Sequence, residues 1–197
     1  MDLRHSYRLI APIYDSVLAS ATRAARERSL GHLPAEAARV LLAGVGTGLD
    51  LPLLPRQHAY TGLDLSAAML RRTGHKQGRL DFTGVLGDAQ RLPFADACFD
   101  QVILHLILAV VPDSQACLRE TARVLSSGGQ VLIFDKFLQP GQRAPLRRLL
   151  NPLVRRVATR LDVVFEDLLR QTPSLVLESD QPALAGGWFR LIRLRRR

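Results

Sequence analysis

The sequence has little cysteine, no long apolar run and no repeated or linker-like segment. Cys98 and Cys117 are its two cysteines, too few for a disulfide framework, and the residues around them lack metal-ligand spacing. We therefore expect no metal site and a reducing, cytoplasmic compartment. The longest apolar stretch, residues 102–111, is interrupted by His105 and is shorter than the ~18 residues of a membrane span. The first residues lack a secretory signal pattern, so we expect no export by that route.

Positive charge, in contrast, is abundant. The 27 basic and 18 acidic residues leave a net charge of +9, and almost all the basic residues are arginine. The guanidinium fork suits phosphate binding, but a GC-rich genome would also enrich arginine, and both explanations stay open. Nucleic-acid binding rests on this charge alone and is the less favoured interpretation. Because no linker or repeat divides the chain, a single domain over residues 1–197 is predicted.

Short apolar runs alternate with helical stretches through the middle of the chain. The predicted strands are 39–43, 59–64, 80–88, 100–104 and 130–135, and the predicted helices between them are 66–72 and 114–125. This alternation, with nearly continuous apolar strands, favours an α/β fold whose parallel sheet is covered on both faces. Ligands of such sheets bind at the carboxyl ends of the strands.

The two ends of the chain have different patterns. Residues 3–30 predict one or two helices, broken near Pro12. After residue 135 an arginine-rich helical region and a second helix, residues 163–169, are expected. Residues 174–178 and 188–194 then predict two strands, separated by Pro182 and the pair Gly186-Gly187. Two strands with a turn between them indicate an antiparallel hairpin at one edge of the sheet.

A glycine-rich turn follows the first predicted strand. Residues 40–48 read Val-Leu-Leu-Ala-Gly-Val-Gly-Thr-Gly, and a helix is expected after them. The spacing is G-x-G-x-G, with Leu49 where the dinucleotide fingerprint requires glycine. Glycines permit unusual backbone angles and let a ligand approach the main chain. A turn without a ligand is the alternative for this motif taken alone.

Acidic residues close the next two strands. Asp64 ends the second strand, where a carboxylate can accept hydrogen bonds from both ribose hydroxyls, each worth about 1.5–3 kcal/mol. Its alternative is a carboxylate near a helix N-terminus capped by Ser66. Asp88, in Gly87-Asp88-Ala89, can accept from an exocyclic adenine amine. Three successive loops thus offer backbone amides, a ribose acceptor and an adenine acceptor in order.

With these motifs the sequence resembles the class I S-adenosylmethionine-dependent methyltransferases over nearly its whole length. The matching segments are the glycine loop, Asp64, residues 87–94, residues 99–104 and residues 123–129, the last with Ser127 in place of the usual proline. The resemblance implies a Rossmann-like α/β fold with helices on both faces of a mostly parallel, seven-stranded sheet. It also implies the strand order 3-2-1-4-5-7-6, an antiparallel strand seven and S-adenosylmethionine as the cofactor.

The resemblance also implies that three regions of the chain have different roles. Residues 1–30 would form a helical lid, residues 38–136 the cofactor-binding core, and residues 137–197 the substrate-side helices and hairpin. The implied cofactor contacts are Tyr7, Tyr14, Ala43, Gly44, Val45, Gly46, Gly48, Asp64, Leu65, Asp88 and Ala89. Core packing is the alternative for the two tyrosines. One departure is Leu42, because the family usually has an acidic residue two positions before the first glycine.

The opening Tyr7–Asp15 is similar to that of bacterial phosphatidylethanolamine N-methyltransferases and of ubiquinone/menaquinone C-methyltransferases. His105, at the end of the fourth strand, faces the transferred methyl in this fold and is the candidate proton acceptor. Its alternative is a histidine satisfied within an apolar run. The resemblance implies a hydrophobic or amphipathic acceptor, a phospholipid amine being favoured. A quinone or small natural product is the second option, and a non-catalytic cofactor-binding or RNA-associated protein is the third.

The region Arg143–Arg160 is basic, contains no acid and has leucines and valines at three- and four-residue steps. Such a helix can lie in the headgroup layer of an anionic membrane, where each basic residue adds about 1 kcal/mol. Its alternative is a helix that packs its apolar stripe on the sheet and presents arginines to water. Peripheral association with the inner membrane face is therefore an open expectation beside a cytoplasmic location.

Overall fold

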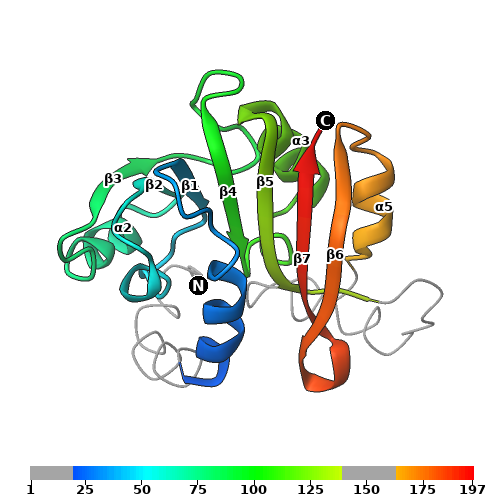
Figure 1. Cartoon of the computed structure of the whole chain (residues 1–197), viewed down its shortest axis with the longest axis horizontal. Coiled ribbons are helices and arrows are strands. Elements are labelled where there is room, and N and C mark those ends of the chain that lie inside the picture. Colours follow the sequence, from blue (N-terminus) through cyan, green and yellow to red (C-terminus); the bar gives the residue numbers. More distant parts are fainter. Residues whose placement is uncertain (1–19, 139–162) are drawn as a thin grey trace, which may run out of the picture.

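A computed structural model of the chain describes residues 20–138 and 163–197. Its centre is a seven-stranded sheet with the order β3-β2-β1-β4-β5-β7-β6 (Figure 1). The strands are β1 Arg39–Ala43, β2 Ala59–Asp64, β3 Asp81–Leu86, β4 Phe99–His105, β5 Leu125–Lys136, β6 Leu175–Leu184 and β7 Phe189–Arg196. Strands β1 to β5 are parallel, and β7 is antiparallel to both β5 and β6. The predicted order and the edge hairpin are both confirmed.

Helices cover both faces of the sheet. A helix at residues 20–30 and α2 (Ala67–Gly74) lie on one face, and α3 (Ser114–Val124) and α5 (Phe165–Arg170) lie on the other (Figure 1). Two of these helices begin with a side-chain cap, since Ser66 accepts from the amide of Met69 and Asp113 from that of Ala116. Such caps satisfy amides that have no partner inside the helix.

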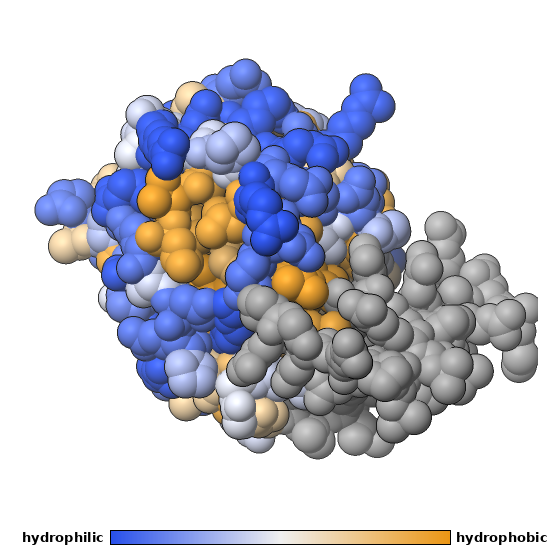
Figure 2. All heavy atoms as spheres, turned by 90° about the vertical axis from the view of Figure 1, so that its right-hand side faces the viewer, coloured by the Kyte–Doolittle hydropathy of each residue, from blue (hydrophilic) through white to orange (hydrophobic). Residues whose placement is uncertain are grey.

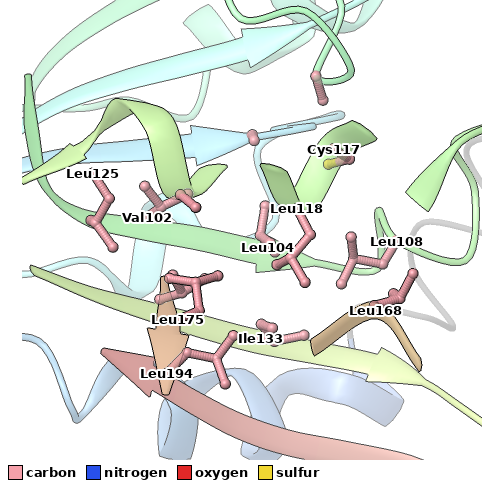
Figure 3. Packing of buried hydrophobic residues seen from close by; sticks show 14 of the residues in the cluster. Val102, Leu104, Leu108, Cys117, Leu118, Leu125, Ile133, Leu168, Leu175 and Leu194 are labelled. Atoms are coloured by element: carbon pink, nitrogen blue, oxygen red, sulfur yellow. The ribbon is translucent and has the colours of Figure 1, made fainter. Parts of the chain in front are cut away.

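Side chains of the central strands point alternately to the two faces of the sheet, and this divides the core into two layers. Leu41 and Leu104 belong to the same buried cluster as residues of α3 and α5, and Figure 3 shows Leu104 beside Leu118 of α3. Their neighbours Leu42 and Ile103 face the helix at residues 20–30. Because side chains of a strand point alternately to opposite faces, strands covered on both sides must be apolar throughout. The nearly continuous apolar runs of the sequence have this cause.

Two local expectations were wrong. The helix predicted after the glycine turn is a single 3-10 turn, η1 (Leu51–Leu53). Pro55 lacks the amide hydrogen that a longer helix would need at that position, whereas Pro52 lies in the first turn, where proline is tolerated. Strand β6 also runs past Pro182, which was assigned to the turn, and reaches Leu184. Proline is tolerated there because β6 is an edge strand with a register shift after residue 182.

The β6 edge is also the place where the hairpin exposes apolar side chains, among them Val176 and Leu177. Figure 2, which views the molecule from this side, shows apolar surface bordered by hydrophilic residues. Among the described residues, no helix is long and apolar enough to cross a membrane. The segment Arg143–Arg160 lies outside the described residues.

Candidate functional site

The glycine turn lies at the carboxyl end of β1, as expected. Gly44, Gly46 and Gly48 all have positive φ, at 73°, 58° and 73°, a region that side chains with a Cβ rarely enter. Gly44 has a second constraint, because a Cβ there would lie 2.1 Å from Cδ1 of Ile107. The first glycine is therefore required both by its backbone angle and by the close approach of the segment after β4.

Asp64 bridges the glycine turn and the start of α2. Its Oδ2 accepts from the amide of Gly46 at 2.8 Å, and its Oδ1 accepts from the amide of Ser66 at 2.9 Å. The hydroxyl of Thr73, in α2, donates to the carbonyl of the same glycine, Gly46, at 2.9 Å. The structure thus shows Asp64 as a carboxylate at a helix start that also holds the glycine turn, and its acceptance of ribose hydroxyls stays a prediction.

Asp88 follows β3 and closes a tight turn of its own. Its Oδ1 accepts from the backbone amide of Gln90 at 2.8 Å. The side-chain amide of Gln90 also donates, from Nε2, to both carboxylate oxygens of Asp88. Ala89 beside it is buried. The Gln90 side chain in turn accepts from the amide of Asp113 at 2.8 Å, so this turn is joined to the start of α3.

Apolar side chains are exposed at this same edge of the sheet. Leu65 follows β2 and is 74% exposed, Leu86 ends β3 and is 60% exposed, and Val110 follows β4 and is 46% exposed. A flat aromatic ligand at the carboxyl edge needs such surfaces on both sides, together with a few polar groups that orient it. The glycine turn, Asp64 and these side chains therefore fit an adenosine-containing cofactor.

His105 ends β4 and is buried, with partners at both ring nitrogens. Its Nδ1 lies 2.9 Å from Oδ1 of Asp50, and its Nε2 lies 2.9 Å from Oγ of Ser29. The ring also meets Phe134 edge-on. This arrangement fits the alternative of a histidine satisfied within the core, because neither ring nitrogen is free to face an acceptor. Proton acceptance by His105 stays a prediction.

The sequence reasoning missed the partners of His105. Arg26 donates from Nη1 to Oδ1 of Asp50 at 2.7 Å and from Nε to the hydroxyl of Thr22 at 3.0 Å. Burial alone raises the pKa of Asp50, but His105 and Arg26 together hold that pKa below its usual range. A signal was present, since Arg26 and Ser29 share one helix face and Asp50 interrupts the apolar run Leu49–Leu51.

Asp135, near the end of β5, is a second buried carboxyl group that the sequence reasoning did not single out. Its oxygens accept from the amides of Lys136 at 2.8 Å and Ala109 at 3.1 Å. Burial raises the pKa of Asp135 to about 6, although these amides oppose the shift. Among the remaining expected contacts, Tyr7 and Tyr14 lie outside the described residues. No group of metal-ligating side chains occurs within the described part of the chain.

Comparison with known proteins gives a consistent assignment. The family model described as a methyltransferase domain matches residues 41–133. The chain is 33% identical over 190 residues to a phosphatidylethanolamine N-methyltransferase of Cereibacter sphaeroides, covering 94% of this chain and 93% of that protein. It is also 33% identical over 174 residues to a demethylmenaquinone methyltransferase of Mycolicibacterium paratuberculosis, covering 83% and 73%.

A solved structure shares the fold. It is described as an S-adenosylmethionine-dependent methyltransferase, possibly a histamine N-methyltransferase, from Thermotoga maritima. The TM-score is 0.72 at 18% identity, and all of both chains is covered. At this identity the match concerns the fold alone.

We expect Gly44→Ala to destabilise the protein more than Gly128→Ala. Both glycines have similar positive φ, 73° and 77°, so the backbone strain of an added Cβ is shared. Only at Gly44 does the Cβ meet a neighbour, Ile107, whereas nothing lies within 4 Å at Gly128. Overpacking should add about 1–3 kcal/mol, measured by urea denaturation. Equal losses in the two variants would contradict this, and Ile107→Ala should recover part of the Gly44→Ala loss.

The free energy of unfolding should depend on pH through Asp135. Folding raises the pKa of its carboxyl from 3.8 to about 6, so its contribution to stability is complete below pH 3.8 and is lost as the pH rises through 6. Compared with Asp135→Asn, the wild-type advantage should fall by about 2–3 kcal/mol between pH 4 and pH 6 and then stay level. Urea denaturation at four pH values measures the difference, and a constant difference would refute the assignment.

Proposed function

The chain belongs to the class I S-adenosylmethionine-dependent methyltransferases, and on that premise we propose that it methylates the amine of a phospholipid headgroup. The observation that carries this proposal is the match with the Cereibacter sphaeroides phosphatidylethanolamine N-methyltransferase, which extends over 94% of this chain and 93% of that protein. The opening Tyr7–Asp15 supports the same group. A match over nearly the whole length of both proteins takes in the segments expected on the acceptor side as well as the cofactor-binding core, which supports the proposal.

The carboxyl edge of the sheet is the proposed cofactor site. Ala43, Gly44, Val45, Gly46 and Gly48 would hold the methionine end through the main chain, and Asp64 would accept from the ribose hydroxyls. Leu65, Asp88 and Ala89 would surround the adenine. The fit rests on positive φ at all three glycines and on the exposed side chain of Leu65. Leu42, which stands where the family usually has an acid, is buried in a cluster with Leu30 and as a leucine presents no charge to the methionine end.

S-adenosylmethionine supplies a methyl group that is already activated on a sulfonium. The protein therefore has to bind the donor, align the acceptor in line with it and exclude water, and alignment supplies much of the rate. Preformed loops serve this purpose, since both the glycine turn and the Asp88 turn are held by hydrogen bonds within the chain. A dedicated catalytic base is not required by this chemistry.

Methylation of a quinone is the second candidate. It is favoured by the demethylmenaquinone methyltransferases, one of which is 33% identical over 83% of this chain. The coverage of that relative, 73%, is lower than the 93% of the phospholipid enzyme. A non-catalytic or RNA-associated role is the reading that family membership disfavours.

Contact with an anionic membrane is part of the proposal. A phospholipid acceptor lies in a membrane surface, and Arg143–Arg160 offers six arginines and no acid to that surface. The same segment would bring the enzyme to the inner face of the membrane.

We expect Asp64→Asn to weaken binding of S-adenosylhomocysteine about 10- to 100-fold, because one charged acceptor for the ribose is lost. Asp81→Asn is the matched control, since Asp81 is exposed at the opposite end of the neighbouring strand β3. Isothermal titration calorimetry measures both affinities. Unchanged binding in Asp64→Asn would place the cofactor elsewhere.

The acceptor can be identified with methyl-labelled S-adenosylmethionine. Purified protein is mixed with vesicles containing phosphatidylethanolamine, and in parallel with a demethylated quinone in detergent. We expect label in the lipid headgroup, and expression in a host without methylated phospholipids should yield them. The Asp64→Asn variant controls for labelling that does not depend on this enzyme. Label in the quinone alone would refute the phospholipid proposal but would be consistent with the methyltransferase assignment.

A further inference from the structure

A buried polar cluster connects three separate parts of the fold. It consists of Thr22, Arg26 and Ser29 from the helix at residues 20–30, Asp50 from the segment after the glycine turn, and His105 from the end of β4. All five residues are at most 6% exposed. The cluster lies on the sheet face that the helix covers, and Phe134 of β5 packs edge-on against the histidine ring.

Its hydrogen bonds follow from the chemistry of the groups. An ionised carboxylate only accepts, so both Nη1 of Arg26 and Nδ1 of His105 donate to Oδ1 of Asp50, at 2.7 and 2.9 Å. Nε2 of His105 and the hydroxyl of Ser29 are paired at 2.9 Å. One carboxylate oxygen is thus shared by two donors from two different elements.

Stability alone is a weak explanation for such a cluster. Burying two charges costs about as much as their attraction returns, and an apolar replacement of similar volume is often no less stable. What directional bonds add is a defined position for each partner. Here the partner with the least regular structure is Asp50, which lies between Gly48 and η1 and makes no side-chain cap bond to that turn.

Two carboxylates therefore anchor the glycine turn, one at its middle glycine and one just after its last glycine. Asp64 and Thr73 hold Gly46 from the α2 side. Asp50 holds the following residues from the opposite side, through Arg26 and His105. Gly48 lies between these anchors and has positive φ, and because glycine has the greatest backbone freedom of any residue type, the anchors decide which conformation this part of the turn keeps.

We propose that Asp50 is a positioning residue, which together with Arg26 and His105 holds the glycine turn in the conformation that binds the cofactor. The inference rests on the proposed cofactor site. It assigns to the helix at residues 20–30 a role in cofactor affinity that does not require direct contact with the cofactor. It also assigns His105 to positioning rather than to proton transfer.

The test compares Asp50→Asn with Asp100→Asn. Asp100 is also paired with an arginine, Arg39, at 2.7 Å, but this pair lies at the amino edge of the same sheet, away from the glycine turn. Calorimetry measures S-adenosylhomocysteine binding, and urea denaturation measures stability. We expect Asp50→Asn to weaken binding about tenfold or more, because small displacements of positioning groups have effects of this size. Asp100→Asn should lose stability with its affinity unchanged.

Hydrogen exchange supplies a readout that a purely stabilising role would not move. In Asp50→Asn without ligand, amides of residues 44–53 should exchange faster than in the wild type, while those of β6 should not. Ser29→Ala removes the hydrogen bond to His105 and leaves every charged group in place. It therefore keeps the test valid if Asp50→Asn does not fold. It should show the same exchange pattern and about threefold weaker binding.

The outcomes separate this inference from the proposed site. If Asp64→Asn weakens binding but Asp50→Asn and Ser29→Ala do not, the cofactor site stands and the positioning role is wrong. If none of the three variants changes the affinity, the glycine turn is not the cofactor site, and both proposals fall. Weaker binding in Asp50→Asn with unchanged exchange of residues 44–53 would also refute positioning through the turn.

Discussion

A carboxylate buried away from water must be paired, and the pairing of Asp50 constrains much of this structure. Its two partners come from the helix at residues 20–30 and from the end of β4, so the helix, the strand and the segment after the glycine turn have one common point. Removing Arg26 would leave the charge of Asp50 without its ion-pair partner in the interior, and removing His105 would leave the carboxylate with one donor fewer. The helix position on the sheet and the course of the chain after Gly48 are therefore coupled.

The carboxyl edge of the sheet combines rigid polar anchors with exposed apolar surface. Asp64 binds an amide of its own loop and one of the glycine turn, and Asp88 binds an amide of its own loop, which fixes these loops before any ligand arrives. Leu65 and Leu86 are left open to solvent beside them. A preorganised site of this kind loses little conformational entropy on binding. This suits a reaction in which the donor is already activated and alignment is the main task of the protein.

The fold and the cofactor-binding core do not identify the acceptor. The core that binds the cofactor is common to enzymes with different acceptors, as the phospholipid and menaquinone relatives illustrate. A shared fold therefore does not identify a substrate. The full-length match with the phospholipid enzyme and the basic segment Arg143–Arg160 are what favour a headgroup amine at a membrane surface.

Local pattern in the sequence was enough for most of the strands, because each apolar run between turn residues can be recognised without knowing its neighbours, whereas the strand order was implied by the family resemblance. The glycine turn, Asp64 and Asp88 were likewise recognisable, since their spacing follows the strands. The tertiary structure alone decided the rest. Arg26, Asp50 and His105 are far apart in the chain, and their contact depends on how the helix at residues 20–30 crosses the sheet. Ile107 excludes a side chain at Gly44 for the same reason, because contacts between distant segments have no local signature.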